Sequence, residues 1–197
     1  QGYGIYFAPC LRAEKKGNAQ SANYVPTLWV DIDCDNELQQ RAIALDKLKT
    51  FDLEPSVIID SGGGWHGYWL LKQPYMLETG DDRTYIANIL KGLFQVLGGD
   101  EGYVKSVASV MRLPSTINTK QEREGACVNI TCFEPDRRYD IQKFDWLKVE
   151  PNNTQPFSAS MANGQHLLPA RTQSYLSAGA FKGDRNRELF AAACQMR

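Results

Sequence analysis

Two aspartates, Asp31 and Asp33, alternate with apolar residues at the end of the segment TLWVDID, residues 27–33. Successive side chains of a β-strand point to opposite faces, so the two carboxylates would share one face while Val30 and Ile32 face the core. Carboxylates about 7 Å apart repel each other and call for a compensating cation, and oxygen ligands suit Mg²⁺ or Mn²⁺. Because D-x-D is a common pattern, two solvated acids leading into a helix cap are the alternative.

A glycine-rich turn, DSGGGWHGYW at residues 60–69, is the second candidate. Three consecutive glycines let the backbone approach a ligand closely, and free N–H groups in such a turn can cradle an anion. His66 follows at the start of an expected strand, where it could donate to a phosphate oxygen or a leaving group. The alternative is an ordinary hairpin with a structural histidine, in which Trp65, Tyr68 and Trp69 are core residues. No Gly-Lys-Ser/Thr follows, so this is not a Walker loop.

A basic stretch runs from residue 103 to residue 120 and contains three cations and no acid. Arg112 and Lys120 flank a Pro-Ser turn, an arrangement that suits phosphate binding. Just upstream, Asp100 or Glu101 could complete a trio of carboxylates with the two aspartates of the first segment. The alternative is a basic loop that merely lies beside an acidic region.

Charge is segregated along the chain although the net charge is only −1. Residues 31–60 carry eight acids and three bases, whereas residues 103–120 carry only bases. A nearly neutral chain is not a general attractor of nucleic acid, so phosphates would have to be held by local patches. An acidic metal cluster facing a cationic anion site is the combination that phosphoryl or nucleotidyl transfer requires.

The elements that would position these residues alternate between short apolar runs and amphipathic stretches, which predicts an α/β (α+β) fold. The 197 residues, 43% hydrophobic and 23% charged, exclude a disordered, collagen-like or coiled-coil chain. Basic residues mark the tip of a loop expected at 12–23. We expect strands at 4–9, 27–33, 56–60, 67–71, 106–113 and 126–133, and helices from Asp35 or Asn36 to Phe51 and from Asp82 to Leu97, the latter ended by Gly98-Gly99.

The composition changes near residue 149, which predicts a catalytic domain at 1–148, a linker at 149–175 and the start of a truncated helical domain at 176–197. The first residue is Gln1 and the last residues lie in an expected helix, so we expect a piece of a longer protein. Five scattered cysteines without a C-x-x-C pair predict free thiols in a reducing cytoplasm and no zinc site. No apolar run approaches about 20 residues, so no membrane span is expected.

The order hhhDhD, then SGGGxHxYW, then an acid followed by RLPxTxNxK resembles the archaeo-eukaryotic primase superfamily, and in particular the primase-polymerases of phages, plasmids and mobile elements. The resemblance covers residues 1–148. It implies that Asp31, Asp33 and Asp100 are metal ligands, with Glu101 as the alternative third acid, and that His66 contacts the phosphates of an incoming nucleotide. The nucleotide-binding residues that it implies are Ser61, Gly63, Gly64, His66, Arg112, Asn118 and Lys120. Ser115 stands where relatives often have glycine.

The resemblance also implies a catalytic core with an RRM-like sheet, followed by a small helical domain. It implies two Mg²⁺ or Mn²⁺ ions, a ribo- or deoxynucleoside triphosphate as substrate, and a single-stranded DNA template with its primer. Template contacts would come from Arg12, Lys15 and Lys16. The expected function is primer synthesis or extension in DNA replication or repair, for a mobile element, with room for a fused helical or helicase domain. The alternatives are an RRM-like nucleic-acid-binding module without catalysis and a metal-dependent nuclease.

Overall fold

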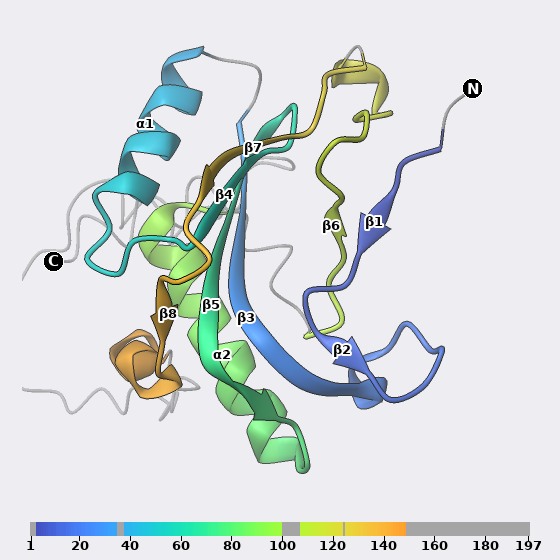
Figure 1. Cartoon of the computed structure of the whole chain (residues 1–197), viewed down its shortest axis with the longest axis vertical. Helices are drawn as coiled ribbons and strands as arrows, with labels where there is room; N and C mark the ends of the chain where they lie inside the picture. The colour runs from blue at the N-terminus through green and yellow to red at the C-terminus, as the bar shows by residue number, and fades with distance from the viewer. Residues whose placement is uncertain (1–2, 35–37, 100–106, 124, 149–197) are drawn as a thin grey trace, which may run out of the picture. The chain divides into compact units, whose positions relative to one another are not determined.

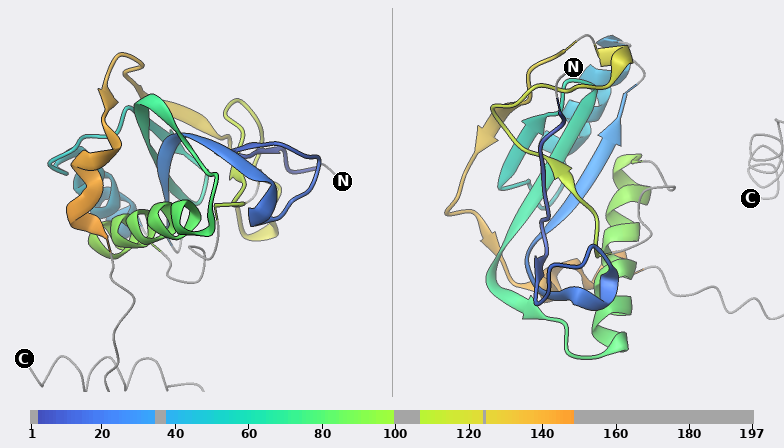
Figure 2. Two further views of the ribbon diagram at one scale, coloured as in Figure 1. Left: turned by 90° about the horizontal axis from the view of Figure 1, so that it is seen from below. Right: turned by 90° about the vertical axis from the view of Figure 1, so that its right-hand side faces the viewer.

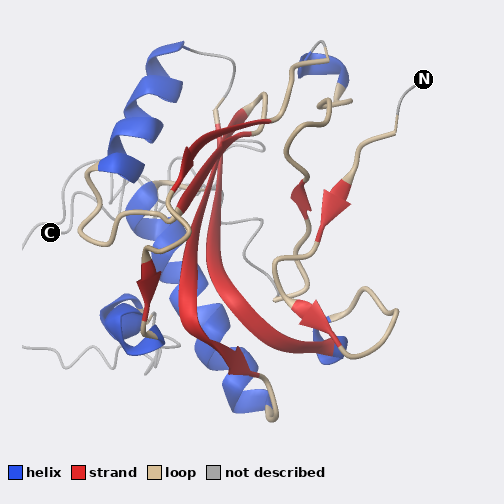
Figure 3. Ribbon diagram, in the orientation of Figure 1, coloured by secondary structure: helices blue, strands red, loops and turns tan. Residues whose placement is uncertain are grey.

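The computed structural model describes residues 3–34, 38–99, 107–123 and 125–148, and all structural statements below concern these ranges (Figure 1). The elements expected beyond residue 148, the linker and the terminal helix, lie outside them. The α/β class predicted from the sequence is confirmed. Figure 3 shows a strongly curved sheet with two long helices against it.

A six-stranded sheet forms the centre of the domain. Its order is β2-β3-β5-β4-β7 with antiparallel neighbours, and a short β8 pairs in parallel with β5. The predicted strand and hairpin that carry the acids and the histidine are both confirmed, although β3 and β5 are longer than expected. The strands are β2 (Leu11–Arg12), β3 (Ala22–Asp33), β4 (Val57–Asp60), β5 (Gly64–Met76), β7 (Asn129–Phe133) and β8 (Arg138–Tyr139).

Two helices, α1 (Leu38–Lys49) and α2 (Gly80–Leu97), cover one face of this sheet. Leu48 of α1 lies against Gly67 of β5, on the face where Val30 of β3 is fully buried. A capping box at Thr79 and Asp82 begins α2, and Gly98 ends it in the left-handed conformation, as the glycine pair predicted. The two residues expected to cap α1 lie outside the described ranges.

The opposite face of the sheet is covered by a two-stranded ribbon, β1 (Tyr6–Phe7) with β6 (Met111–Arg112). The ring of Phe7 lies 6.0 Å from the ring of Tyr68, which joins the ribbon to β5. Figure 2 shows the resulting order: helices, curved sheet, then ribbon. Asp31 of β3 therefore lies half-buried between two layers, whereas Asp33 at the end of the strand is exposed.

Several details differ from the predictions. The strands expected at 4–9 and 106–113 are each two residues long within the described ranges. The loop expected at 12–23 contains the end of β2, the 3₁₀ helix Ala19–Ser21 and the first two residues of β3. Two further 3₁₀ helices were not predicted: Gln121–Arg123, and Ile141–Leu147, which is linked to α2 by a hydrogen bond from Tyr85 to Asp145.

Two other predictions concern side chains. Trp65, Tyr68 and Trp69 are core residues, and the four cysteines within the described ranges form no disulfide. No helix in these ranges is long and apolar enough to cross a membrane.

Candidate active site

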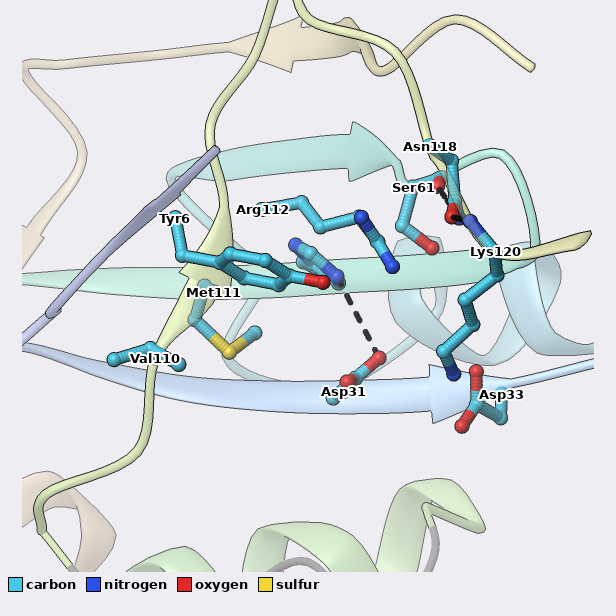
Figure 4. Close-up of a pocket in the computed structure, with 10 residues that line it drawn as sticks. Tyr6, Asp31, Asp33, Ser61, Val110, Met111, Arg112, Asn118 and Lys120 are labelled. Carbon is cyan, nitrogen blue, oxygen red and sulfur yellow. Dashed lines mark hydrogen bonds and ion pairs between the residues drawn. The ribbon is translucent and has the colours of Figure 1, made fainter. Parts of the chain in front are cut away.

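A pocket opens between the ribbon and the sheet, at the end of β3 (Figure 4). Seven residues predicted from the sequence line it: Asp31, Asp33, Ser61, His66, Arg112, Asn118 and Lys120. Tyr6, Val110 and Met111 complete the lining. Residues from three separated sequence motifs therefore meet in one small space.

Asp31 and His66 occupy directly opposite register positions on β3 and β5, and Asp33 is opposite Gly64. Opposite residues of antiparallel strands share a face, which brings the acid motif and the histidine motif together. The distance from Asp31 Oδ1 to His66 Nε2 is 3.6 Å. Val30 and Ile32 are buried on the other face, as the alternation predicted.

His66 is almost fully buried, with 2% of its surface exposed. Burial, and secondarily the charge of Arg112, lower its pKa from 6.5 to about 4. The ring is therefore neutral near pH 7. Its Nδ1 lies 3.2 Å from the hydroxyl of Tyr68, a contact that the sequence motifs did not indicate.

Arg112 is the principal cation of the pocket and is only 6% exposed. Its guanidinium lies over the ring of Tyr6, 4.9 Å from the ring centre, and its Nη1 is buried without a hydrogen-bond partner. Buried polar atoms are nearly always paired, so this free donor marks a place for an external acceptor. An anion such as a phosphate supplies that acceptor.

Asn118 holds the third motif against the glycine turn. Its Nδ2 donates to the carbonyl of Ser61 at 2.8 Å, and its Oδ1 accepts from the backbone N–H of Lys120 at 3.1 Å. The side chain of Lys120 extends from this loop toward Asp33 (Figure 4). Asn118 therefore connects the Ser61 turn to the Lys120 loop and positions both residues at the pocket.

The glycine turn has packing roles in the free protein, and its contact with a nucleotide stays a prediction. Gly63 and Gly64 are not among the pocket-lining residues, and the N–H of Gly62 donates to Asp60. Gly64 allows close strand packing, because a Cβ there would lie 2.0 Å from the Ile32 carbonyl oxygen. Gly63 leaves room for the guanidinium of Arg123, which a Cβ would meet at 2.4 Å.

Two residues near the site were missed by sequence reasoning. Arg123 donates to the Cys34 carbonyl at 3.1 Å and lies 4.0 Å from Asp33. Tyr6 stands beside Arg112 only because β1 pairs with β6. Neither belongs to a local motif, and no sequence signal pairs these distant segments.

The proposed third acid, Asp100 or Glu101, lies outside the described residues. Its neighbour Gly99 is described, and a Cβ on Gly99 would lie 3.0 Å from the backbone oxygen of Asp31. The chain therefore passes close to the first acid immediately before Asp100. Within the described ranges no cluster of three or more His, Cys, Asp or Glu side chains could hold a metal ion.

The predicted template residues have mixed surroundings. Arg12 is partly buried, and its Nη2 donates to the Ala108 carbonyl at 2.8 Å, so its guanidinium connects β2 to the segment that precedes β6. Lys15 and Lys16 are exposed, and Lys16 pairs with Glu14 at 2.8 Å. The exposed lysines remain the better candidates for contact with a nucleic-acid backbone.

Comparison with known proteins supplies one clear likeness. No family model and no curated protein matches the sequence. A solved structure, the AEP domain of the primase-polymerase (PrimPol) of cyanophage S-2L, superposes with a TM-score of 0.54 at 17% identity. The match covers 75% of this chain and 71% of the cyanophage chain. This chain and the cyanophage AEP domain therefore share a fold. In this chain Asp31 and His66 lie on the central sheet, and Arg112 reaches the same pocket from the β1–β6 ribbon.

Proposed function

We propose that this chain catalyses template-dependent nucleotidyl transfer on DNA, as a primase, a polymerase or both. The observation that carries the proposal is a single pocket in which Asp31 and Asp33 face Arg112, a buried arginine with an unpartnered Nη1. Carboxylates that need dications and a donor that needs an anion are the two requirements of nucleotidyl transfer. The shared fold with a primase-polymerase domain supports the same choice.

The donor set fits Mg²⁺ or Mn²⁺. Asp31 and Asp33 offer hard oxygen ligands from one strand end, and the approach of Gly99 to Asp31 supports Asp100 as the third carboxylate. Two divalent ions held by these acids would lower the pKa of a primer 3′-hydroxyl and offset the charge of the triphosphate. Glu101 is the alternative third ligand.

The chain's own donors would hold the triphosphate. Arg112 Nη1 is free to donate to a phosphate oxygen, and Lys120 adds a second positive charge at the same pocket. Ser61 and His66 line the same pocket and would add neutral donors. Asn118 holds the Ser61 turn and the Lys120 loop together through its two hydrogen bonds.

The reaction joins the primer 3′-oxygen to the α-phosphorus of the nucleotide and breaks the bond between that phosphorus and its bridging oxygen. The hydroxyl proton passes to solvent, and pyrophosphate leaves with the electron pair. Positive charge at Arg112 and Lys120 stabilises the leaving pyrophosphate. A single-stranded template and its primer are the proposed partners, with backbone contacts from Lys15 and Lys16.

The test is nucleotide incorporation on primed and unprimed templates with Mg²⁺ or Mn²⁺. The double variant Asp31→Asn/Asp33→Asn should lose incorporation, because amides cannot replace the two anionic ligands. The control Asp52→Asn removes an exposed acid after α1 and should incorporate normally. Shortening of DNA without nucleotide would indicate a nuclease, and nucleotide binding without incorporation would indicate a binding module. Either outcome would overturn the proposal.

A further inference from the structure

We infer that Tyr68 is a positioning residue for His66. Its hydroxyl donates to Nδ1 and thereby keeps the ring hydrogen on Nε2, the nitrogen that faces Asp31. The functional consequence rests on the proposed function, because the Nε2–H then serves as a donor to a nucleotide phosphate. The hydrogen-bond arrangement itself is a property of the free protein.

The two side chains are two residues apart on β5 and share one face of the sheet. Tyr68 Oη lies 3.2 Å from His66 Nδ1, and the rings meet edge to face at 77°. Both side chains are nearly fully buried. A buried hydroxyl requires a partner, and Nδ1 supplies it.

The direction of this hydrogen bond follows from the contact between Nε2, on the other side of the ring, and Asp31. In a neutral imidazole one nitrogen carries the hydrogen and the other accepts. If Nδ1 carried it, the Nε2 lone pair would face the Asp31 carboxylate oxygen at 3.6 Å, which is repulsive. With the hydrogen on Nε2, the N–H points toward that oxygen, and Nδ1 accepts from the tyrosine.

The surroundings of Tyr68 favour its role as the donor. Burial and the charge of Asp31 raise the pKa of its phenol, so the hydroxyl keeps its hydrogen. Phe7 packs against the tyrosine ring from β1, and Trp29 and Val57 are its register partners on β3 and β4. These contacts fix the position of the hydroxyl beside Nδ1 of His66.

The first test is the tautomer of His66, measured by long-range ¹H–¹⁵N correlation spectroscopy on the free protein. The chain has only two histidines, so the variant His166→Gln assigns the signals directly. We expect an unprotonated Nδ1 and a protonated Nε2 in the wild type, and a shift toward a mixture of tautomers in Tyr68→Phe. A protonated Nδ1 in the wild type would overturn the inference, as would an unchanged spectrum in a folded Tyr68→Phe. If that variant does not fold, the wild-type spectrum alone decides.

The second test measures the affinity for a deoxynucleoside triphosphate with Mn²⁺. Tyr68→Phe should weaken binding by about two- to tenfold, the range expected for one lost hydrogen bond. In a His66→Ala background the same change should leave the affinity unaltered, because the ring it orients is gone. Equal losses in both backgrounds would mean a structural role and overturn the inference.

A matched control comes from the same strand. Tyr75→Phe removes a hydroxyl that donates to Asp82 at 3.0 Å, away from the pocket, and should not change nucleotide affinity. If the wild type binds no nucleotide, the proposed function fails while the spectrum of the free protein still decides the tautomer. The two failures are therefore distinguishable.

Discussion

Asp31 and His66 face each other across β3 and β5, with Asp31 Oδ1 3.6 Å from His66 Nε2. Helix α1 and strand β4 separate these residues in the sequence, yet the register of two antiparallel strands makes them neighbours. Their contact joins an acid motif to a glycine-histidine motif, and the ribbon β1–β6 adds Arg112 from above. The predictions below follow from this arrangement.

The stability of the metal-free protein should depend on pH through His66. Its pKa is about 4 when folded and 6.5 when unfolded, so between these values the unfolded state binds more protons. The free energy of unfolding should be unaffected by His66 above pH 6.5 and fall by about 3 kcal/mol as the pH drops to 4. Urea unfolding in EDTA should show a shallower loss for His66→Gln than for the wild type. Parallel plots of the free energy of unfolding against pH for His66→Gln and the wild type would contradict the prediction. His166→Gln is the control and should behave as the wild type does.

Replacing Arg112 should weaken nucleotide binding without lowering the stability of the fold. Arg112→Met removes a buried charge with an unpartnered Nη1, so the free energy of unfolding should stay equal or rise by up to about 2 kcal/mol. Nucleotide affinity should fall at least tenfold, since a charged hydrogen bond is lost. Calorimetric binding and urea unfolding measure the two effects.

Arg41→Met is the matched control for Arg112→Met. Arg41 pairs with Asp60 at 2.7 Å, so its replacement leaves a partly buried acid without its cation and should lower stability. A large loss of stability in Arg112→Met would show that the pocket arginine is a structural residue.

The close approach of β5 to β3 should make Gly64 intolerant of a side chain. In Gly64→Ala the Cβ would lie 2.0 Å from the Ile32 oxygen, and the strands must separate. We expect a loss of about 1–3 kcal/mol in the free energy of unfolding. Gly80→Ala is the control, because nothing lies within 4 Å of its Cβ and alanine favours the first turn of α2 by up to about 1 kcal/mol. Equal effects at the two positions would be inconsistent with this packing.

Ser115 adopts the left-handed conformation, with φ 63°. No other non-glycine residue among the described ones has a positive φ. The left-handed backbone explains why glycine would suit this turn, as the sequence pattern noted above indicates. Ser115→Gly should raise the free energy of unfolding by about 0.5–1 kcal/mol, while Ser115→Val should lower it. A stabilised valine variant in thermal unfolding would contradict the conformational explanation.

Local patterns were enough to predict the elements that carry the site. Alternation placed Asp31 and Asp33 on one face, the glycines marked the hairpin before His66, and helical spacing with a glycine stop located α2. Each of these signals acts within a few residues, where backbone sterics and burial decide the conformation.

Long-range pairing could not be read from the sequence. The contact of Tyr6 with Arg112 depends on β1 meeting β6, two strands of two residues each, which have almost no pattern. The close approach of Arg123 to Gly63 and the hydrogen bond between Tyr68 and His66 likewise arise from tertiary packing. For the same reason the sequence did not show that Gly63 leaves room for Arg123 or that Gly64 lets β5 approach β3 closely.

The most direct test of the central claim is a crystal structure with Mn²⁺ and a non-hydrolysable deoxynucleoside triphosphate, using the anomalous signal of manganese. We predict manganese bound to the carboxylates of Asp31, Asp33 and Asp100 or Glu101, with a phosphate oxygen accepting from Arg112 Nη1. The same crystals of Asp31→Asn/Asp33→Asn should show no manganese there. Manganese and triphosphate bound elsewhere, or a pocket that stays without both at saturating concentrations, would contradict nucleotidyl transfer at this site.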